Sequence, residues 1–371
     1  MRVLVVNAGS SSLKLRLLDG DDALLRQHDL PALRGRVDEA LLAAALADLP
    51  APDAIGHRIV HGGAHYRTPV RLDDRVLQDL NALSDLAPLH QPPAFNAHAL
   101  VERALPRVPA VACFDTAFHA TLPAAAFTYA LPRPWRERWP IRRFGFHGLS
   151  HAYASRRTAE LIGRPVEELR IVTCHLGAGA SLCAVQAGRS IDTTMGFTPL
   201  EGLVMATRAG SVDPGLLLWL LEHERLEIGA LTHALEYESG LAGLAGSADM
   251  RDVLARAEDG DGDATLALGV YVHRLRAGIA AMAVALDGLD ALVFTGGVGE
   301  HAPAVRARTG AGLGLLGIAL HSDRNASSTT DADIGAPNAR VRTFVLTARE
   351  DLEIARQVRN LLGASAETSG A

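Results

Sequence analysis

The chain has 371 residues, which at roughly 150 residues per domain is enough for about two domains with sizeable buried cores. Charged residues make up 21%, with 36 basic and 42 acidic side chains and a net charge of −6, so neither nucleic acid nor an anionic membrane is expected as the main partner. No apolar run approaches the ~18 residues of a membrane span. The three cysteines lack CxxC spacing and support neither a disulfide framework nor a zinc ribbon. Secreted, fibrous, disordered and membrane-spanning classes are therefore excluded.

Strand-like and helix-like patterns alternate along the chain, which predicts an α/β protein. In chain order we expect strands at 2–7 and 13–19, helices near 37–49, 73–87 and 93–105, a strand at 108–114, a helix from about 147 to 160, strands at 169–175 and 181–187, helices within 213–286, strands at 291–295 and 341–347, and a helix from 349 to 362. The Pro-rich stretch at 122–140 is expected to be the least regular part.

A weak internal repeat indicates duplication. Residues 7–20 align without a gap on residues 175–188, and both segments contain a polar residue, a glycine, small residues and a strand pattern. Two similar halves, each beginning with a β-hairpin, would produce this likeness, although shared strand patterning alone would also produce it.

The first glycine- and serine-rich turn, Asn7–Lys14, has the composition of a phosphate-binding loop. Small residues let backbone N–H groups face an anion, and Asn7 offers an oxygen to hydrated Mg²⁺. Lys14 is the only lysine of the chain, and a compact ammonium retained among so many arginines favours phosphate contact over a plain hairpin turn.

Two further glycine-rich turns follow apolar strands, at His175–Ser181 and at Phe294–Glu300. Because α/β sheets bind ligands at the carboxyl ends of their strands, three such turns together indicate a nucleotide. The sequence contains no GxxxxGK[ST] motif, and its GxGxxG match at 312–317 follows a helical stretch rather than a strand, so neither common nucleotide signature applies.

Charged residues near these turns complete a candidate site. Arg58 and Arg208 are flanked by Gly and apolar residues, which predicts partial burial near a small anion, although a surface position is the usual alternative. Asp115 and Glu350 each follow a strand, where helix capping and Mg²⁺ binding together with Asn7 are both open.

A zinc site was also considered. His147 and His151 have helical i, i+4 spacing but lack the intervening Glu of zinc hydrolases, and His57 and His61 lie too far apart along a strand to chelate one ion. Zinc is therefore the least favoured alternative.

Taken together, ten motifs between residues 3 and 356 resemble the acetokinase family of the actin/hexokinase/Hsp70-like ATPase superfamily. They include the segments around Asn7–Lys14, Gly56–Gly63, Phe114–His119, Phe144–His151 and Phe294–Glu300. Membership implies reversible transfer of a phosphoryl group between ATP and acetate, giving ADP and acetyl phosphate, by direct in-line transfer.

The resemblance also implies a role for each matching residue. It implies catalytic roles for Asp115, His147 and Arg208, and Mg²⁺ (Mn²⁺ in its place) at Asn7 and Glu350. The implied nucleotide set is Lys14, His175, Leu176, Gly177, Ala178, Gly179, Asp249, Met250, Arg251, Gly297, Val298, Gly299, Glu300 and His301. The implied acetate set is Arg58, Val60, Leu89, His90, Phe146 and Pro199.

The implied architecture is two duplicated RNase H-like (actin-like ATPase) α/β domains around a central cleft, in a cytoplasmic homodimer. We expect one domain at 1–118 plus a returning helix at 351–371, and a nucleotide-binding domain at 119–350. Ala178, Ala180, Met250 and His301 depart from the family pattern, which predicts altered nucleotide affinity or preference. Propionate or butyrate kinase and a nucleotide-binding protein that does not transfer phosphate are the alternatives; membrane and nucleic-acid partners are not expected.

Overall fold

The computed structural model describes residues 1–9, 12–33, 35–87, 91–328 and 331–368. The chain divides into two compact units. The first contains Met1–Ala120, Phe146–Tyr153 and Arg349–Ala371, and the second contains Thr121–Gly145 and Ala154–Ala348. In the described part of the chain, no helix has both the length and the apolar character needed to span a bilayer.

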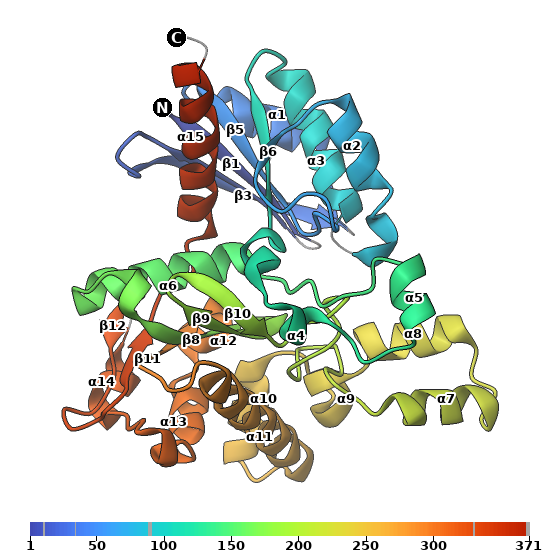
Figure 1. Ribbon diagram of the computed structural model, residues 1–371, viewed down its shortest axis with the longest axis vertical. Coiled ribbons are helices and arrows are strands. Elements are labelled where there is room, and N and C mark those ends of the chain that lie inside the picture. Colours follow the sequence, from blue (N-terminus) through green and yellow to red (C-terminus); the bar gives the residue numbers. More distant parts are fainter. Residues whose placement is uncertain (10–11, 34, 88–90, 329–330, 369–371) are drawn as a thin grey trace. The chain divides into compact units, whose positions relative to one another are not determined.

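The first unit is built on a sheet with strand order β4-β3-β2-β1-β5-β7-β6 (Figure 1). Its strands are β1 (Val3–Ala8), β2 (Ser12–Leu18), β3 (Leu24–Leu33), β4 (Arg36–Val37), β5 (Ala54–Ile59), β6 (Val70–Arg71) and β7 (Ala110–Phe114). Its helices are α1 (Glu39–Ala47), α2 (Asp74–Asn81), α3 (Gln91–Ala104) and α15 (Glu350–Thr368). The strands β1, β5 and β7 are parallel, whereas β2 and β3 form antiparallel hairpins from β1.

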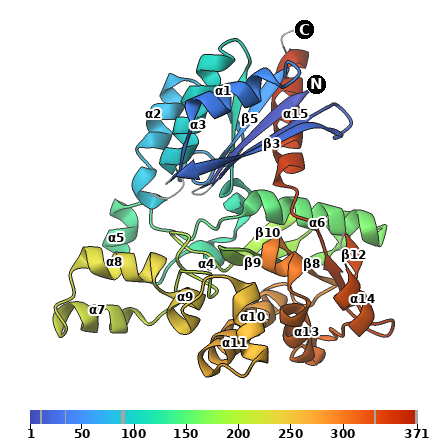
Figure 2. The same ribbon diagram turned by 180° about the vertical axis from the view of Figure 1, so that it is seen from behind.

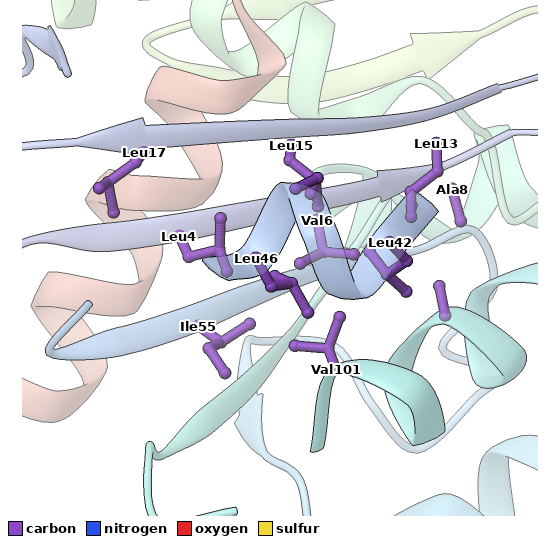
Figure 3. Packing of buried hydrophobic residues seen from close by; sticks show 12 residues of the cluster. Leu4, Val6, Ala8, Leu13, Leu15, Leu17, Leu42, Leu46, Ile55 and Val101 are labelled. Carbon is purple, nitrogen blue, oxygen red and sulfur yellow. The ribbon is translucent and has the colours of Figure 1, made fainter. Parts of the chain in front are cut away.

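Side-chain alternation on β1 divides the core of this unit between the two faces of the sheet. Leu4 and Val6 pack with Leu42 of α1 and Val101 of α3 (Figure 3). Val3 and Val5 belong to a separate cluster with residues of α15 on the opposite face. Figures 1 and 2 show α15 on one side of this sheet and α1 and α3 on the other. The last helix of the chain is therefore an integral part of the first unit.

The second unit has a sheet with strand order β10-β9-β8-β11-β13-β12. Its strands are β8 (Arg170–Leu176), β9 (Ala180–Gln186), β10 (Arg189–Thr193), β11 (Ala291–Thr295), β12 (Ala332–Asp333) and β13 (Arg342–Val345). Its helices are α4 (Ala124–Phe127), α5 (Arg133–Arg138), α7 (Pro214–Glu222), α8 (Ile228–Tyr237), α9 (Gly240–Ala245), α10 (Met250–Glu258), α11 (Gly262–Ala285), α12 (Gly296–His301), α13 (Pro303–Ala311) and α14 (Ser322–Ser327). The division between the units falls within α6 (Gly148–Ile162).

The two sheets share one connectivity. In the first, β3-β2-β1 are antiparallel neighbours and β1-β5-β7 are parallel; in the second, β10-β9-β8 and β8-β11-β13 repeat this pattern. Each sheet ends on a short antiparallel strand, β6 or β12. The α/β class is confirmed, and this correspondence supports the duplication indicated by the repeat between residues 7–20 and 175–188.

Candidate functional site

The first unit brings four predicted site residues together at one edge of its sheet. Asn7 lies near the carboxyl end of β1, Arg58 near that of β5, and Asp115 directly after β7. These three strands are parallel neighbours, so their carboxyl ends meet. Glu350 is the first residue of α15, which packs on the same three strands.

An ion pair with two-point hydrogen bonding forms the centre of this cluster. Arg58 donates from Nη2 to Asp115 Oδ2 at 2.6 Å and from Nε to Asp115 Oδ1 at 3.1 Å. Its Nη1 donates to Asn7 Oδ1 at 3.2 Å and lies 3.7 Å from Glu350 Oε2. The Asn7 amide in turn donates to Glu350 Oε2 at 3.1 Å. The four side chains thus form one connected polar network, which we call the Arg58 cluster.

Burial determines the electrostatics of the Arg58 cluster. The Asp115 side chain is only 1% exposed, and burial raises the pKa of its carboxyl, an effect that the Arg58 guanidinium opposes. Burial by itself would lower the pKa of Arg58, but Asp115 and Glu350 outweigh it and raise the pKa above its usual value. The short contact between charged partners favours the ionised pair at neutral pH. Glu350 Oε2 places a second carboxylate near the same guanidinium.

Arg58 keeps some binding capacity after these contacts. A guanidinium carries five N–H groups, and the described partners accept one from Nε, one from Nη2 and one from Nη1. One N–H of Nη1 and one N–H of Nη2 therefore have no hydrogen-bond acceptor among the described residues. Arg58 can hold Asp115 and still donate to an incoming oxyanion.

A backbone hydrogen bond next to His147 holds this residue near Asp115. The N–H of Gly148 donates to the carbonyl oxygen of Asp115 at 2.9 Å, and His147 has a positive φ of 56°. A Cβ on Gly148 would collide with that carbonyl and lie 2.8 Å from Phe118 Cβ. Only glycine permits this close approach, a requirement that the sequence analysis did not identify even though Gly148 follows His147 directly.

The remaining predicted residues of this unit differ in burial. Lys14 is paired with Asn7 across the β1–β2 hairpin, its side chain is exposed, and it forms no ion pair with any described residue. Val60 and Phe146 are 5% and 1% exposed, which suits an apolar lining. Leu89 and His90 lie outside the described residues, so their predicted positions stay untested.

The second unit carries two predicted nucleotide loops side by side. β8 and β11 are parallel neighbours, with Thr295 opposite His175, so the turn Gly177–Gly179 and helix α12 begin at the same edge. Gly296 has a φ of +78°, and a Cβ there would lie 2.8 Å from the carbonyl oxygen of Leu176. These two loops therefore approach each other closely through their backbones.

The side chains of the Gly296–His301 loop have different surroundings. Glu300 turns back, and its Oε1 accepts from the backbone N–H of Gly296 and of Ala348, both at 3.0 Å. Gly297 and His301 are exposed and Val298 is half-buried. The carboxylate of Glu300 thus stabilises the loop, while the glycine backbone and His301 remain accessible to a ligand.

Arg208 and Pro199 are brought into direct contact. Arg208 donates from Nη1 to the carbonyl oxygen of Pro199 at 2.9 Å, and burial lowers its pKa. Among the described residues it forms no salt bridge, which is costly for a cation that is half-buried. The loop that carries it also meets the His175 loop, because Ala206 N–H donates to the carbonyl of Ala178 at 3.1 Å.

The third predicted nucleotide segment begins α10. Asp249 caps this helix through the backbone N–H of Arg251 at 2.9 Å, and Arg251 pairs with it at 2.5 Å. This bonding lowers the pKa of the Asp249 carboxyl to about 2. Arg251 is 89% exposed, whereas Met250 is 4% exposed and packs in the core. A ligand here would meet Asp249 and Arg251 rather than the Met250 side chain.

Cysteine thiols and a metal site made of several side chains are two other kinds of candidate chemistry. Cys113, Cys174 and Cys183 are free and buried, and burial raises the pKa of each thiol. Within the described ranges, no group of three or more His, Cys, Asp or Glu residues is arranged to hold a metal ion. Any divalent ion at the Arg58 cluster would therefore depend on Asn7, Glu350, water and substrate oxygens.

Fold and site together define an α/β protein with duplicated sheets, an arginine–carboxylate cluster on one and paired glycine loops on the other. A sequence model of the acetokinase family matches residues 36–356. Curated relatives include acetate kinases of Gloeobacter violaceus, 44% identical, and Clavibacter sepedonicus, 46% identical; each alignment covers 96% of this chain and 98% of the relative.

Solved structures agree with this match. An acetate kinase of Porphyromonas gingivalis has a TM-score of 0.88 at 33% identity, covering 97% of this chain and 99% of that one. A propionate kinase of Francisella tularensis has a TM-score of 0.87 at 32% identity, covering 96% and 98%. The chain belongs to the acetokinase family.

Proposed function

We propose that this protein is an acetate kinase that transfers a phosphoryl group reversibly between ATP and acetate. The observation that carries the proposal is the Arg58 cluster, in which a partly buried arginine with two unused N–H groups adjoins an amide and a carboxylate. The family relationship supports the same assignment.

Binding of the acceptor is assigned mainly to residues of the first unit. The unused N–H groups of Arg58 donate to the acetate carboxylate, and the buried Val60 and Phe146 exclude water from its methyl group. Leu89, His90 and Pro199 complete the acetate set in the proposal. Acetate is already a carboxylate at neutral pH and needs no strong base, so Asp115 acts mainly by fixing the orientation of Arg58.

The donor set of the Arg58 cluster fits hydrated Mg²⁺. The ion usually keeps several waters and binds one or two carboxylates plus phosphate oxygens, and Glu350 with Asn7 Oδ1 offers that set. When bound, Mg²⁺ neutralises charge on the phosphates.

Binding of ATP is assigned mainly to the second unit, at His175–Gly179, Asp249–Arg251 and Gly297–His301, with Lys14 as a phosphate contact from the first. Backbone N–H groups of glycine-rich turns suit phosphate oxygens. Phosphoryl transfer depends on positioning and on positive charge at the equatorial oxygens of the moving group. Arg58, His147 and Arg208 supply that charge in the proposal.

A propionate kinase is the second candidate, because the Francisella tularensis structure is almost as similar as the Porphyromonas gingivalis acetate kinase. One methylene in an apolar pocket is worth ~1–3 kcal/mol, so the two activities differ measurably. Trapping the acyl phosphate with hydroxylamine for acetate, propionate and butyrate, each with ATP and GTP, gives kcat/KM for every pair. We expect acetate with ATP to be best; ATP binding without any acyl phosphate would refute the proposal.

We further propose a homodimer acting in the cytoplasm, with the two units as its two domains. The second unit exposes large apolar side chains on α5, α7 and α8 and directly after α5, namely Trp135, Trp139, Leu216, Leu218, Trp219, Ile228 and Tyr237. Exposed apolar surface of this kind is typical of subunit contacts. Light scattering on the purified protein measures the mass: twice 39.2 kDa supports the dimer, and 39.2 kDa contradicts it.

A further inference from the structure

A pocket lies within the first unit, on the side of its sheet away from the Arg58 cluster. It has a volume of about 160 Å³ and is lined by the start of β5 and β7, the end of α3 and the segment after it, and β6. Successive strand residues face opposite sides, so His57 lines this pocket while Arg58 points the other way. At ~30 Å³ per water, the volume suits a molecule of phosphate size with water beside it.

The charges around this pocket are mostly positive. Arg71 and Arg107 line it, and in the described parts of the chain neither forms an ion pair or a side-chain hydrogen bond. Glu102 is the one carboxylate in the lining, and its side chain is 63% exposed. Two guanidinium groups against one exposed carboxylate make the pocket positive, in a protein whose net charge is −6.

Two buried imidazoles form its inner wall. His98 Nδ1 and His57 Nε2 are 3.3 Å apart, and burial lowers the pKa of both rings, so the pair is neutral. His98 Nε2 is buried without a hydrogen-bond partner and lies 3.7 Å from Glu102 Oε2. Proximity to this carboxylate favours a proton on Nε2, with His57 donating to Nδ1. His98 belongs to the pocket lining, and its Nε2–H then has no hydrogen-bond acceptor among the described residues.

We propose that this pocket binds a small oxyanion through Arg71, Arg107 and the Nε2–H of His98. Inorganic phosphate and short carboxylates share the chemistry that these donors recognise. The site differs from the one assigned to acetate and ATP, because its lining includes none of those residues. The inference therefore does not depend on the proposed function.

The test is a titration of ¹⁵N-histidine-labelled protein with inorganic phosphate or malonate, with chloride as the ionic-strength control. The NMR signal of His98, assigned with His98→Asn, reports on this pocket even if phosphate also binds elsewhere. We expect a saturable shift of that signal with phosphate, malonate or both, and the stronger ligand identifies the class. No shift with either anion, or the same shift with chloride, would overturn the proposal.

Matched variants test the donors. Arg71→Gln with Arg107→Gln should weaken anion binding at least tenfold while phosphotransferase activity stays within twofold, which shows that the variant is folded. Arg75→Gln, a neighbouring exposed arginine outside the lining, should leave binding unchanged. Equal affinity in the double variant and the parent would contradict the assignment of the arginines.

Discussion

At the scale of single residues, the ion pair between Arg58 and Asp115 contributes to the stability of the fold and also belongs to the proposed acceptor site. Asp115 is buried and its carboxylate is balanced by two guanidinium hydrogen bonds. Breaking a buried pair by removing one partner leaves an uncompensated charge, whereas removing both charges costs much less. A variant that lacks one partner of the ion pair should therefore be less stable than a variant that lacks both charges.

Arg58→Gln should lower the free energy of unfolding by about 3 kcal/mol. Arg58→Gln combined with Asp115→Asn should recover most of that loss, because no buried charge remains. Arg103→Gln is the control: it breaks an exposed pair with Glu39 and should cost under about 1 kcal/mol. Urea unfolding measures all three, and a double variant less stable than Arg58→Gln would contradict the ion-pair account.

The glycine after His147 gives a second residue-level prediction. Gly148→Ala forces a Cβ against the Asp115 carbonyl and Phe118, and overpacking of this kind costs about 1–3 kcal/mol. The displaced backbone should also lower kcat by moving His147. Gly269→Ala, in open space within α11, should instead gain up to about 1 kcal/mol. Similar melting temperatures for the two variants would be inconsistent with the steric argument.

At the scale of elements, α15 holds Glu350 in the Arg58 cluster by packing against β5. A Cβ on Gly56 would lie 2.5 Å from Ile354 Cγ2 and 2.9 Å from Val358 Cγ2. Ile354 is fully buried, so helix and strand are in tight contact at this point. The contact explains why a strand that supplies a site residue carries glycine in its interior.

This contact can be measured as a coupling. Gly56→Ala should destabilise by about 1–3 kcal/mol through overpacking, and Ile354→Ala by about 2–5 kcal/mol through a cavity. In the double variant the new methyl partly fills the cavity, so the combined loss should be smaller than the sum by about 1 kcal/mol. Strict additivity would show that α15 and β5 are not in tight contact.

Elements with strong periodicity could be predicted from the sequence, and weakly patterned ones could not. The buried strand at 291–295 is present with the expected bounds, and the hairpins at 2–19 and 169–187 are confirmed with small shifts. Strand β3 was missed because Leu24–Leu33 alternates poorly, contains Pro31 and is mostly exposed. The stretch at 122–140, expected to be irregular, contains the short helices α4 and α5.

The sequence indicated which residues belong to the candidate site, but it did not indicate which of their side chains contact one another. Strand ends and glycine turns identified Asn7, Arg58 and Asp115, since parallel strands deliver such residues to one edge. The local sequence gives no distance, however, so the direct bond between Arg58 and Asp115 was not foreseen. The pocket at His57 and His98 was missed for the same reason: its residues are 41 positions apart.

At the scale of the whole molecule, buried neutral histidines make stability depend on pH. Burial lowers the pKa of His119 to about 4, below the usual value of 6.5. As pH falls, His119 binds a proton in the unfolded chain before it does so in the folded chain. The stability contributed by neutral His119 is therefore fully present above pH 6.5 and is lost progressively toward pH 4. His57 and His98 act in the same direction.

His119 alone should cost about 2 kcal/mol of unfolding free energy between pH 7 and 5. His119→Gln should flatten the decline measured by urea unfolding across that range, whereas His223→Gln, whose ring is exposed, should not. If the slope of unfolding free energy against pH is unchanged in His119→Gln, this residue is not a source of the pH dependence.

The central claim is that the Arg58 cluster binds the carboxylate acceptor in phosphoryl transfer. The most direct measurement is acetyl phosphate formation by purified Arg58→Gln and by its control Arg103→Gln, with ATP affinity measured in parallel. We predict that Arg58→Gln lowers kcat/KM for acetate at least a hundredfold while ATP affinity changes less than threefold, and that the control matches the parent. Parental kcat/KM in Arg58→Gln would contradict the claim.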